Sequence, residues 1–359
     1  MPLLRELNVG ENLFTGPIPA GVGLLTSLNT FVASENFFTG PVLDSFGALT
    51  GLEILRLNDN SLSGNPSAAF FSSVSLLELD LSGNTLTGPI NLQPTGLGLL
   101  ERLKLSRNAL TGPIPSNVGS LFALVEFDVS TNFLSGAVPF ELAILPALEI
   151  VNLSDNSFLG SIPEELAVIV GLRELDLSTN FFSGAIPEGL TLLQNLEILR
   201  VSNNPLGSTL PASLGTMTSL VELDASFANL NGGVPVSLVS SPFLERLYLN
   251  DNILSGPLLP GTEAPLLLAD VQLQNNQISG NLPTEIGTWI SLGTWAVGAF
   301  NVLMVHRLYI STYHMCWDLT DNLSFSFDRI NQSGEQCHLR KHTLGSLHST
   351  PLERGQFES

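Results

Sequence analysis

Asparagine recurs every 24 residues along most of this chain and sets the phase of every other residue in it. Its eleven positions are Asn12, Asn36, Asn60, Asn84, Asn108, Asn132, Asn156, Asn180, Asn204, Asn252 and Asn276, and Ala228 fills the one gap in the series. A leucine stands eight residues before each of these twelve positions, from Leu4 to Leu268, with no insertion or deletion. A fixed period of this length is typical of stacked supersecondary repeats that share a continuous core.

Each repeat follows the pattern LxxLxLxxNxLxGxIPxxLxxLxx. In the eighth repeat these positions include Leu172, Leu175, Leu177, Asn180 and Gly184. The L-x-L pair alternates with a period of two, which predicts a short strand that buries one face. One such strand cannot bury its apolar face alone, so neighbouring repeats must stack on it.

The residues around the turn have separate physical roles. Buried backbone groups need hydrogen-bond partners, and an asparagine amide supplies two donors and one acceptor in a small volume. We therefore expect the asparagines to tie each repeat to the next. Glycine stands four residues later in eleven of twelve repeats, which predicts a positive φ or a close backbone approach; the ninth repeat has Ser208 there and Gly207 beside it. The prolines, such as Pro187, predict extended or turn structure.

These residues resemble the leucine-rich-repeat family, and the GPIP and GAIP segments at 16–19, 112–115 and 184–187 resemble its plant-type extracellular subclass. The resemblance covers residues 3–297. It implies an α/β fold, a right-handed solenoid with a parallel concave β-sheet and a mostly irregular convex side. The subclass includes ectodomains of receptor-like kinases, receptor-like proteins and inhibitors of cell-wall-degrading enzymes, so it also implies an extracellular or cell-surface location.

Composition limits the possible functions. The net charge of −20 argues against nucleic-acid binding, because an acidic stack repels phosphate. The excess acid keeps a long apolar stack soluble, or alternatively selects a partner by charge. Residues 1–297 contain no histidine and no cysteine, which removes His-assisted nucleophiles and most metal sites, and no phosphate-binding loop is present. We therefore expect a non-enzymatic protein without cofactor or metal.

The two ends of the chain differ from its middle. The first repeat starts at residue 3 without a cap or a signal peptide, which predicts that the natural domain begins earlier. We expect residues 1–297 to form the solenoid, with twelve repeats and a partial thirteenth, and residues 298–359 to form a separate tail. The uncharged run at 286–305 is long enough to cross a bilayer, but its glycines and polar residues favour an imperfect last repeat. Membrane association is thus expected only through missing or C-terminal sequence.

Three interpretations of the tail at 298–359 stay open. It is a diverged cap with a disulfide between Cys316 and Cys337, a disordered tail, or a reading frame that continues into non-coding sequence. The repeat pattern stops abruptly after Val297, which favours the last two.

The outward-facing strand positions form regular rows. Four residues before the asparagine position, the alternate repeats carry Asp80, Asp128, Asp176 and Asp224, and the repeats between them carry Arg56, Lys104, Asn152, Arg200 and Tyr248. A 48-residue period therefore overlies the 24-residue one. Neighbouring strands lie roughly 4.8 Å apart, so we expect a charge ladder along this row. Exposed ion pairs are weak, and the ladder should therefore serve register and solubility more than binding.

Aromatic residues break this regularity and identify a candidate binding site. Aromatic and arginine residues are favoured anchors of recognition surfaces, and the predicted concave side of the ninth to eleventh repeats carries Arg200, Asp224, Phe227, Arg246 and Tyr248. Phe227 precedes Ala228 in the one repeat without its asparagine. This departure indicates either a functional site or neutral drift, with Asn229 taking over the bonding.

Phe133 and Phe181 follow the asparagine in the sixth and eighth repeats, and we expect them to pack beneath the turn. The site thus rests on the concave residues. The sequence as a whole predicts a protein or peptide recognition module of the receptor-like ectodomain type. The alternative is a soluble scaffold or enzyme inhibitor without a signalling partner.

Overall fold

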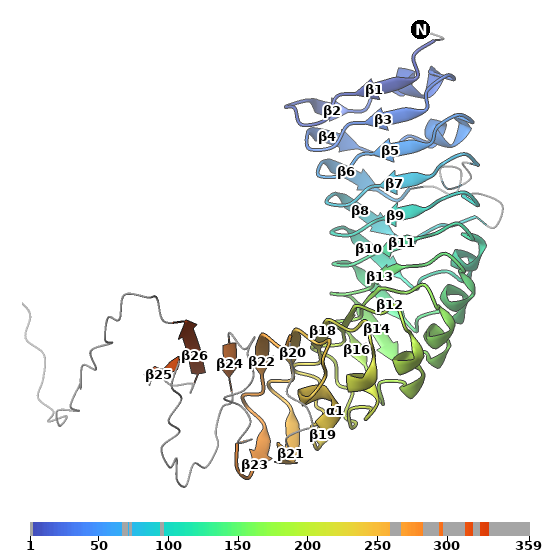
Figure 1. Cartoon of the computed structure of the whole chain (residues 1–359). Coiled ribbons are helices and arrows are strands. Elements are labelled where there is room, and N and C mark those ends of the chain that lie inside the picture. The colour runs from blue at the N-terminus through green and yellow to red at the C-terminus, as the bar shows by residue number, and fades with distance from the viewer. Residues whose placement is uncertain are drawn as a thin grey trace, which may run out of the picture.

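The chain is a curved stack of coils, with one coil for each 24-residue repeat (Figure 1). The computed structural model describes residues 3–66, 71, 74–93, 97–258, 267–282, 294–296, 313–318 and 324–329, with side chains up to residue 282. Within these ranges the α/β repeat architecture expected from the sequence is confirmed, with a long parallel sheet and short helical turns on the outer side.

The L-x-L segments form the main sheet, which lines the inner side of the curve. Its parallel strands are β1 (Glu6–Asn8), β3 (Thr30–Val32), β5 (Ile54–Arg56), β7 (Glu78–Asp80), β9 (Arg102–Lys104), β11 (Glu126–Asp128), β13 (Ile150–Asn152), β15 (Glu174–Asp176), β17 (Ile198–Arg200), β18 (Glu222–Asp224), β20 (Arg246–Tyr248), β22 (Asp270–Gln272) and β24 (Thr294–Ala296). Partners differ by 24 residues throughout, as Leu175 and Leu199 do. The sequence period is therefore the strand register.

A second parallel sheet follows the asparagine turn, and the sequence did not predict it. Its strands are β2 (Thr15–Pro17), β4 (Phe37–Gly40), β6 (Ser61–Gly64), β8 (Thr85–Gly88), β10 (Ala109–Gly112), β12 (Phe133–Gly136), β14 (Ser157–Gly160) and β16 (Phe181–Phe182). A separate three-stranded sheet continues it with β19 (Asn231–Gly232), β21 (Ile253–Pro257) and β23 (Gln277–Ser279). These strands are too short for an alternating pattern to stand out in the sequence.

Short helices close the outer side of most coils. They are the 3-10 helices η1 (Ala20–Leu24), η2 (Asp44–Ala48), η4 (Ser116–Ser120), η5 (Phe140–Ile144), η6 (Glu164–Val168), η7 (Glu188–Leu192) and η8 (Leu214–Thr216), and the α-helical turn α1 (Val236–Val239). Prolines such as Pro163 precede them in extended conformation, as expected. Their missing N–H group costs nothing at the start of a helix.

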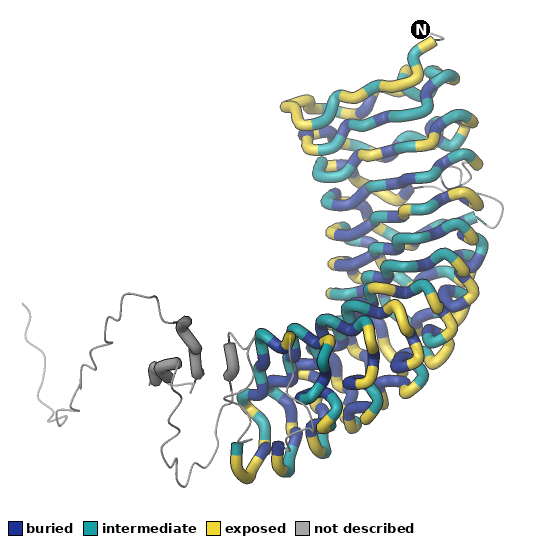
Figure 2. The backbone as a smooth tube through the Cα atoms, viewed as in Figure 1, coloured by how far each residue is buried: buried dark blue, intermediate teal, exposed yellow. Residues whose placement is uncertain are grey.

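The repeat leucines form one continuous core along the stack. Leu172, Leu175 and Leu177 are fully buried, like their equivalents in neighbouring repeats. Figure 2 shows these buried positions running through the interior of the coils from one repeat to the next. The phenyl rings of Phe158 and Phe182 stack at 6.4 Å and extend this core at the second row of strands.

The asparagine ladder ties each repeat to the one before it, which confirms the role expected from the sequence. Asn180 Nδ2 donates to the backbone oxygens of Leu153 (3.0 Å), Leu177 (3.2 Å) and Ser178 (3.1 Å). Its Oδ1 accepts from the backbone N–H of Phe158 at 3.0 Å. One buried side chain thus satisfies backbone groups of two successive repeats.

The glycine positions also behave as expected. Gly184 has a φ of +87°, and in the ninth repeat Gly207, not Ser208, takes the left-handed conformation with a φ of +71°. The residue just before each asparagine position is left-handed as well, although it is a glycine only at Gly83. The sequence analysis missed this second left-handed position.

The second sheet is interrupted at the ninth and tenth repeats. Pro205 has no N–H to donate, and Ala228 has no amide to bridge the turns. The backbone N–H of Leu206 therefore donates to Asn204 oxygen within its own repeat, at 2.9 Å. Asn229 does not replace the missing side chain, because it is exposed to solvent. Asn252 Oδ1 instead accepts from the backbone N–H groups of Ala228 (3.0 Å) and Leu230 (2.8 Å).

Beyond the last repeats, two antiparallel strands, β25 (Tyr313–Asp318) and β26 (Ser324–Arg329), extend the main sheet past β24. Cys316 lies in β25, but Cys337 and most of 286–305 lie outside the described residues, as does much of the tail at 298–359. The possible disulfide and membrane span therefore stay predictions. No helix within the described ranges is long and apolar enough to cross a membrane.

Candidate binding surface

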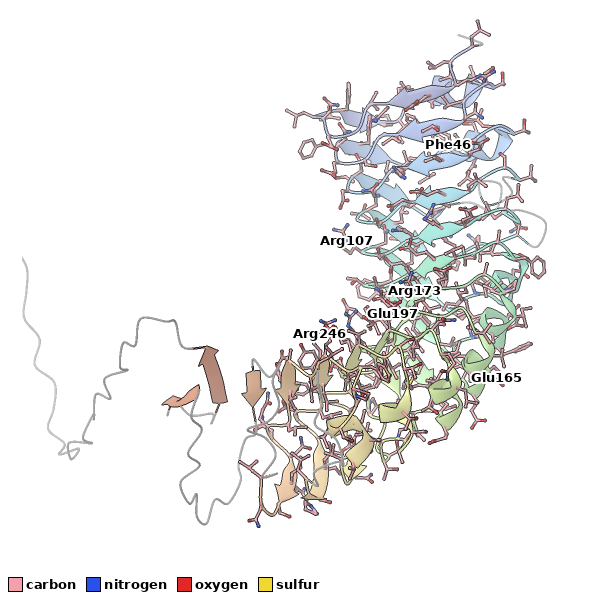
Figure 3. All side chains as sticks on the ribbon, in the orientation of Figure 1. Phe46, Arg107, Glu165, Arg173, Glu197 and Arg246 are labelled. Carbon is pink, nitrogen blue, oxygen red and sulfur yellow. The ribbon has the colours of Figure 1, made fainter. Side chains whose placement is uncertain are left out.

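The main sheet presents two outward rows of side chains on the inner side of the curve. In β17, Leu199 points into the core, while Ile198 and Arg200 flank it on the outward-facing side. Because adjacent strands are in register, Arg200 lies opposite Asp224, and Asp224 lies opposite Tyr248. Figure 3 shows Arg246 projecting from this inner side.

Glu222 is the centre of an ion-pair cluster that joins two predicted site residues. Its Oε1 accepts from Arg200 Nε and its Oε2 from Arg246 Nε, both at 2.6 Å. Arg200 also reaches Glu174 at 3.1 Å. Burial alone would raise the pKa of Glu222, but the hydrogen bonds from the two arginines outweigh it and hold the pKa below its usual value. The carboxylate stays ionised and fixes both guanidinium groups.

Glu222 was not among the residues singled out from the sequence. A signal for it existed, because Glu78, Glu126, Glu174 and Glu222 repeat with the same 48-residue period, two residues before the repeating aspartates. The sequence analysis did not use this repetition. Their alternation with arginine and lysine makes them possible partners of these cations, as it does the repeating aspartates.

Tyr248 lies beside this cluster on β20. Its hydroxyl donates to Asp270 Oδ2 at 3.0 Å. Burial, followed by the hydrogen bond to Asp270, raises the pKa of Tyr248 to about 12. The hydroxyl is therefore a neutral donor already engaged within the protein, and the ring is the part of Tyr248 that can contact a ligand.

Phe227 stands at the exit of β18 and is 52% exposed. Its φ is +52°, a conformation that bulky residues rarely adopt and that costs free energy. The residue at this position has a positive φ in every repeat. The backbone of the stack therefore imposes this conformation on Phe227. An exposed phenyl ring in this conformation is an unusual choice for this row, which elsewhere carries mainly polar residues.

Asp224 is held differently from the other predicted site residues. Its Oδ1 accepts from the backbone N–H (3.0 Å) and the hydroxyl (2.7 Å) of Ser226. Asp80, Asp128 and Asp176 make the same local contact with the serine two residues later. Asp224 therefore has a turn-stabilising role that recurs along the stack.

The expected charge ladder along one row is present at one pair, where Arg200 Nη1 lies 3.5 Å from Asp176 Oδ2, but the shorter contacts of the cations run elsewhere. Arg56 Nη2 donates to Glu78 at 3.0 Å, and Lys104 Nζ lies 2.8 Å from Glu126, so each cation pairs diagonally with a glutamate of the next strand. The aspartates are occupied by their serines, which leaves the glutamates as the stronger partners. Arg102 also approaches Glu78 at 3.7 Å, which reproduces the Arg200–Glu222–Arg246 arrangement in the third to fifth repeats.

Phe133 and Phe181 do not pack beneath the turn, and that expectation was also wrong. They are 64% and 61% exposed at the start of β12 and β16. Because the second sheet alternates its side chains, the residue after the asparagine points outward and the next one, such as Phe182, fills the core. Without the second sheet, this direction was not predictable.

The repeat structure agrees with a match to a known protein family. Four segments, 99–121, 147–168, 171–193 and 195–217, match the family model described as Leucine Rich Repeat. The chain is a leucine-rich-repeat protein. No curated protein sequence matches it. No group of three or more His, Cys, Asp or Glu residues in the described leucine-rich repeats could hold a metal ion.

Solved structures similar to this leucine-rich-repeat protein include plant receptors. The plant peptide hormone receptor RGFR1 in complex with RGF2 is 32% identical with a TM-score of 0.77, over 80% of this chain and 46% of that one. PEPR1–AtPEP1 is 29% identical with a TM-score of 0.70, over 83% and 45%. The Arabidopsis HAESA ectodomain with an extended IDA peptide hormone is 28% identical with a TM-score of 0.64, over 80% and 56%. The chain spans about half the length of these structures.

Proposed function

We propose that this leucine-rich-repeat protein binds a peptide or protein ligand on its concave face, centred on the ninth to eleventh repeats. The observation that carries this proposal is that Glu222 fixes Arg200 and Arg246 on β17 and β20, that Tyr248 also lies on β20, and that the exposed Phe227 follows β18 between them. Arginine and tyrosine are among the residue types most enriched where binding energy concentrates, and side chains fixed in advance lose less entropy on binding. The similarity to peptide-hormone receptor ectodomains supports the same class of ligand.

A matched comparison inside the chain tests the proposal. Arg56 and Arg102 share Glu78 as Arg200 and Arg246 share Glu222, but the corresponding positions of their repeats lack the aromatic residues. The probe is a set of peptides selected from a displayed random library on the wild-type protein. We expect R200E/R246E and F227S/Y248A to weaken peptide binding at least about tenfold, a loss typical of truncated binding anchors. R56E/R102E should leave it unchanged.

Thermal unfolding of all three variants controls for damage to the stack. Both arginine variants remove the partners of a glutamate and should lower the melting temperature, R200E/R246E by more, because Arg200 also pairs with Glu174. If the selected peptides bound all three variants with wild-type affinity, the proposed concave site would be wrong. An equal loss of peptide affinity in R56E/R102E would mean that general electrostatic attraction, and not a defined site, accounts for the binding.

A further inference from the structure

The charges of the repeats are divided between the two faces of the stack. All lysines and arginines before residue 298 lie between seven residues and one residue before the asparagine position, at Arg5, Arg56, Arg102, Lys104, Arg107, Arg173, Arg200 and Arg246. That segment forms the concave strands and the turn after them. The rest of each repeat forms the second sheet and the outer turns. The charged residues in this part are aspartates and glutamates, with no lysine or arginine. Figure 3 shows Glu165 on this outer side, opposite Arg173 and Glu197.

Three neighbouring outer helices end in exposed, large apolar side chains. Ile144, Val168 and Leu192 occupy the last position of η5, η6 and η7 and are 53%, 64% and 73% exposed. These helices lie side by side along the stack. At the same position, η2, η4 and η8 end in Ala48, Ser120 and Thr216. The stack therefore does not need an apolar residue at this place.

A row of carboxylates runs parallel to this apolar row. Glu141, Glu164, Glu165 and Glu188 lie in the first turn of the same three helices, roughly 6–8 Å from the helix ends at about 2 Å per residue. None of the four has an ion-pair partner among the residues that the structure describes, and Glu188 accepts a hydrogen bond from Ser213. The helix dipole favours acids at these starts, but it does not account for the apolar ends.

An open groove of about 700 Å³ adjoins the acidic row. It runs across the seventh to ninth repeats, and its walls include Ile162, Ile186, Leu210, Glu164 and Glu188. The outer face of these repeats thus offers an apolar row, a parallel acidic row and a groove beside them. Exposed apolar side chains next to unpaired charge are characteristic of interaction surfaces.

We propose that this outer face, the Ile144–Val168–Leu192 row with its four glutamates, binds a segment of another protein that presents apolar side chains beside lysine or arginine. Charge complementarity selects this occupant, because no cation of the outer repeat segments neutralises the glutamates. A second copy of the chain would bring the same acids to the contact. Anionic lipid headgroups would be repelled for the same reason.

A short synthetic amphipathic peptide of leucine and lysine serves as the probe, with a leucine–glutamate peptide of the same pattern and oligolysine as its controls. We expect the protein to bind the leucine–lysine peptide at least about tenfold more tightly than either control, because apolar burial and charge act together. Fluorescence anisotropy at physiological salt measures all three. Equal binding of oligolysine would overturn the proposal, since net charge alone would then account for it.

Matched variants locate the binding. I144S/V168T/L192S introduces residue types that the chain already carries at this position, and E141Q/E164Q/E165Q/E188Q removes four charges. Each should lower the affinity for the leucine–lysine peptide about tenfold or more, as expected for loss of central contacts. L24S changes an exposed leucine at the same position of η1, and E6Q/E11Q/E35Q/D155N removes four charges elsewhere. These two controls should bind as the wild type does.

All variants replace surface side chains, so their melting temperatures should stay close to that of the wild type. Unchanged peptide affinity in the apolar triple variant, or equal loss in both charge variants, would overturn the proposal. R200E/R246E should have no effect on this peptide, which separates the outer surface from the concave site.

Discussion

The first eight repeats and the four that follow share one leucine core but differ on the side of the coil that follows the asparagine turn. In the first eight, an eight-stranded second sheet runs without a break. At the ninth and tenth repeats, Pro205, Gly207 and Ala228 depart from the pattern, and the second sheet divides. The main sheet passes through both regions in the same register. The core and main sheet therefore determine the stack, whereas the asparagine turn determines the second sheet.

The two regions also differ on the concave face. Both carry a glutamate shared by two arginines, Glu78 in the first and Glu222 in the second. Only the second adds an exposed phenylalanine, Phe227, and a tyrosine, Tyr248. The departure from the repeat pattern and the candidate aromatic anchors thus lie in the same repeats. Natural sequences tend to depart from their regular pattern at functional sites.

The largest expected effect tests what the two regions share. Leu175→Asp and Leu223→Asp each place an unpaired carboxylate at a fully buried position, one in the eighth repeat and one in the tenth. Each should cost at least about 4 kcal/mol and unfold the neighbouring coils, because a buried charge without a partner is not tolerated. Urea unfolding followed by circular dichroism measures both. A much smaller loss at Leu223 would mean that the core is weaker in the tenth repeat than in the eighth.

Removing an asparagine from the regular region should have the next largest effect. Asn180→Ala deletes four hydrogen bonds and leaves the backbone N–H of Phe158 without its acceptor. The expected cost is about 2–3 kcal/mol, because Leu153 and Leu177 oxygens each keep another asparagine donor. The free energy of unfolding measures it. A loss below about 0.5 kcal/mol would show that the ladder is dispensable.

Restoring the missing asparagine should have a smaller effect of opposite sign. Asn at 228 would lie within reach of the oxygens of Val201, Ala225 and Ser226 and the N–H of Leu206, by analogy with the other repeats. Ala228→Asn should therefore stabilise the protein by about 1 kcal/mol and slow hydrogen exchange of the Leu206 amide. Destabilisation would instead indicate that the alternative turn of the ninth repeat excludes the side chain.

The sequence predicted the stack, the main sheet and the asparagine bonding because each depends on one residue type at a fixed spacing. It did not predict the second sheet, whose strands are two to five residues long and carry mixed residues after the asparagine. That omission caused the wrong direction for Phe133 and Phe181. Short strands gain their stability from neighbouring coils, which a single repeat does not reveal.

The sequence predicted that Arg200, Asp224 and Tyr248 lie on neighbouring strands, but it did not predict the contacts of the candidate site. Arg200 and Arg246 come together through Glu222, because a diagonal glutamate outcompetes an aspartate already bound by its serine. Choosing between two acids at similar distances depends on side-chain length and on local hydrogen bonds. Spacing in the sequence carries no information on that choice.

The smallest expected effect concerns Tyr248, which distinguishes the second region from the first. Its pKa is raised from 10.0 to about 12 by burial and by Asp270. A raised folded-state pKa means that the stabilising contact is complete below pH 10 and is lost as the pH rises towards 12. A pH titration of tyrosinate absorbance, taken as wild type minus Tyr248→Phe, should place this ionisation well above 10 while circular dichroism shows the stack still folded. Ionisation near 10 in the folded protein would mean that the ring is solvated and that Asp270 does not hold its hydroxyl.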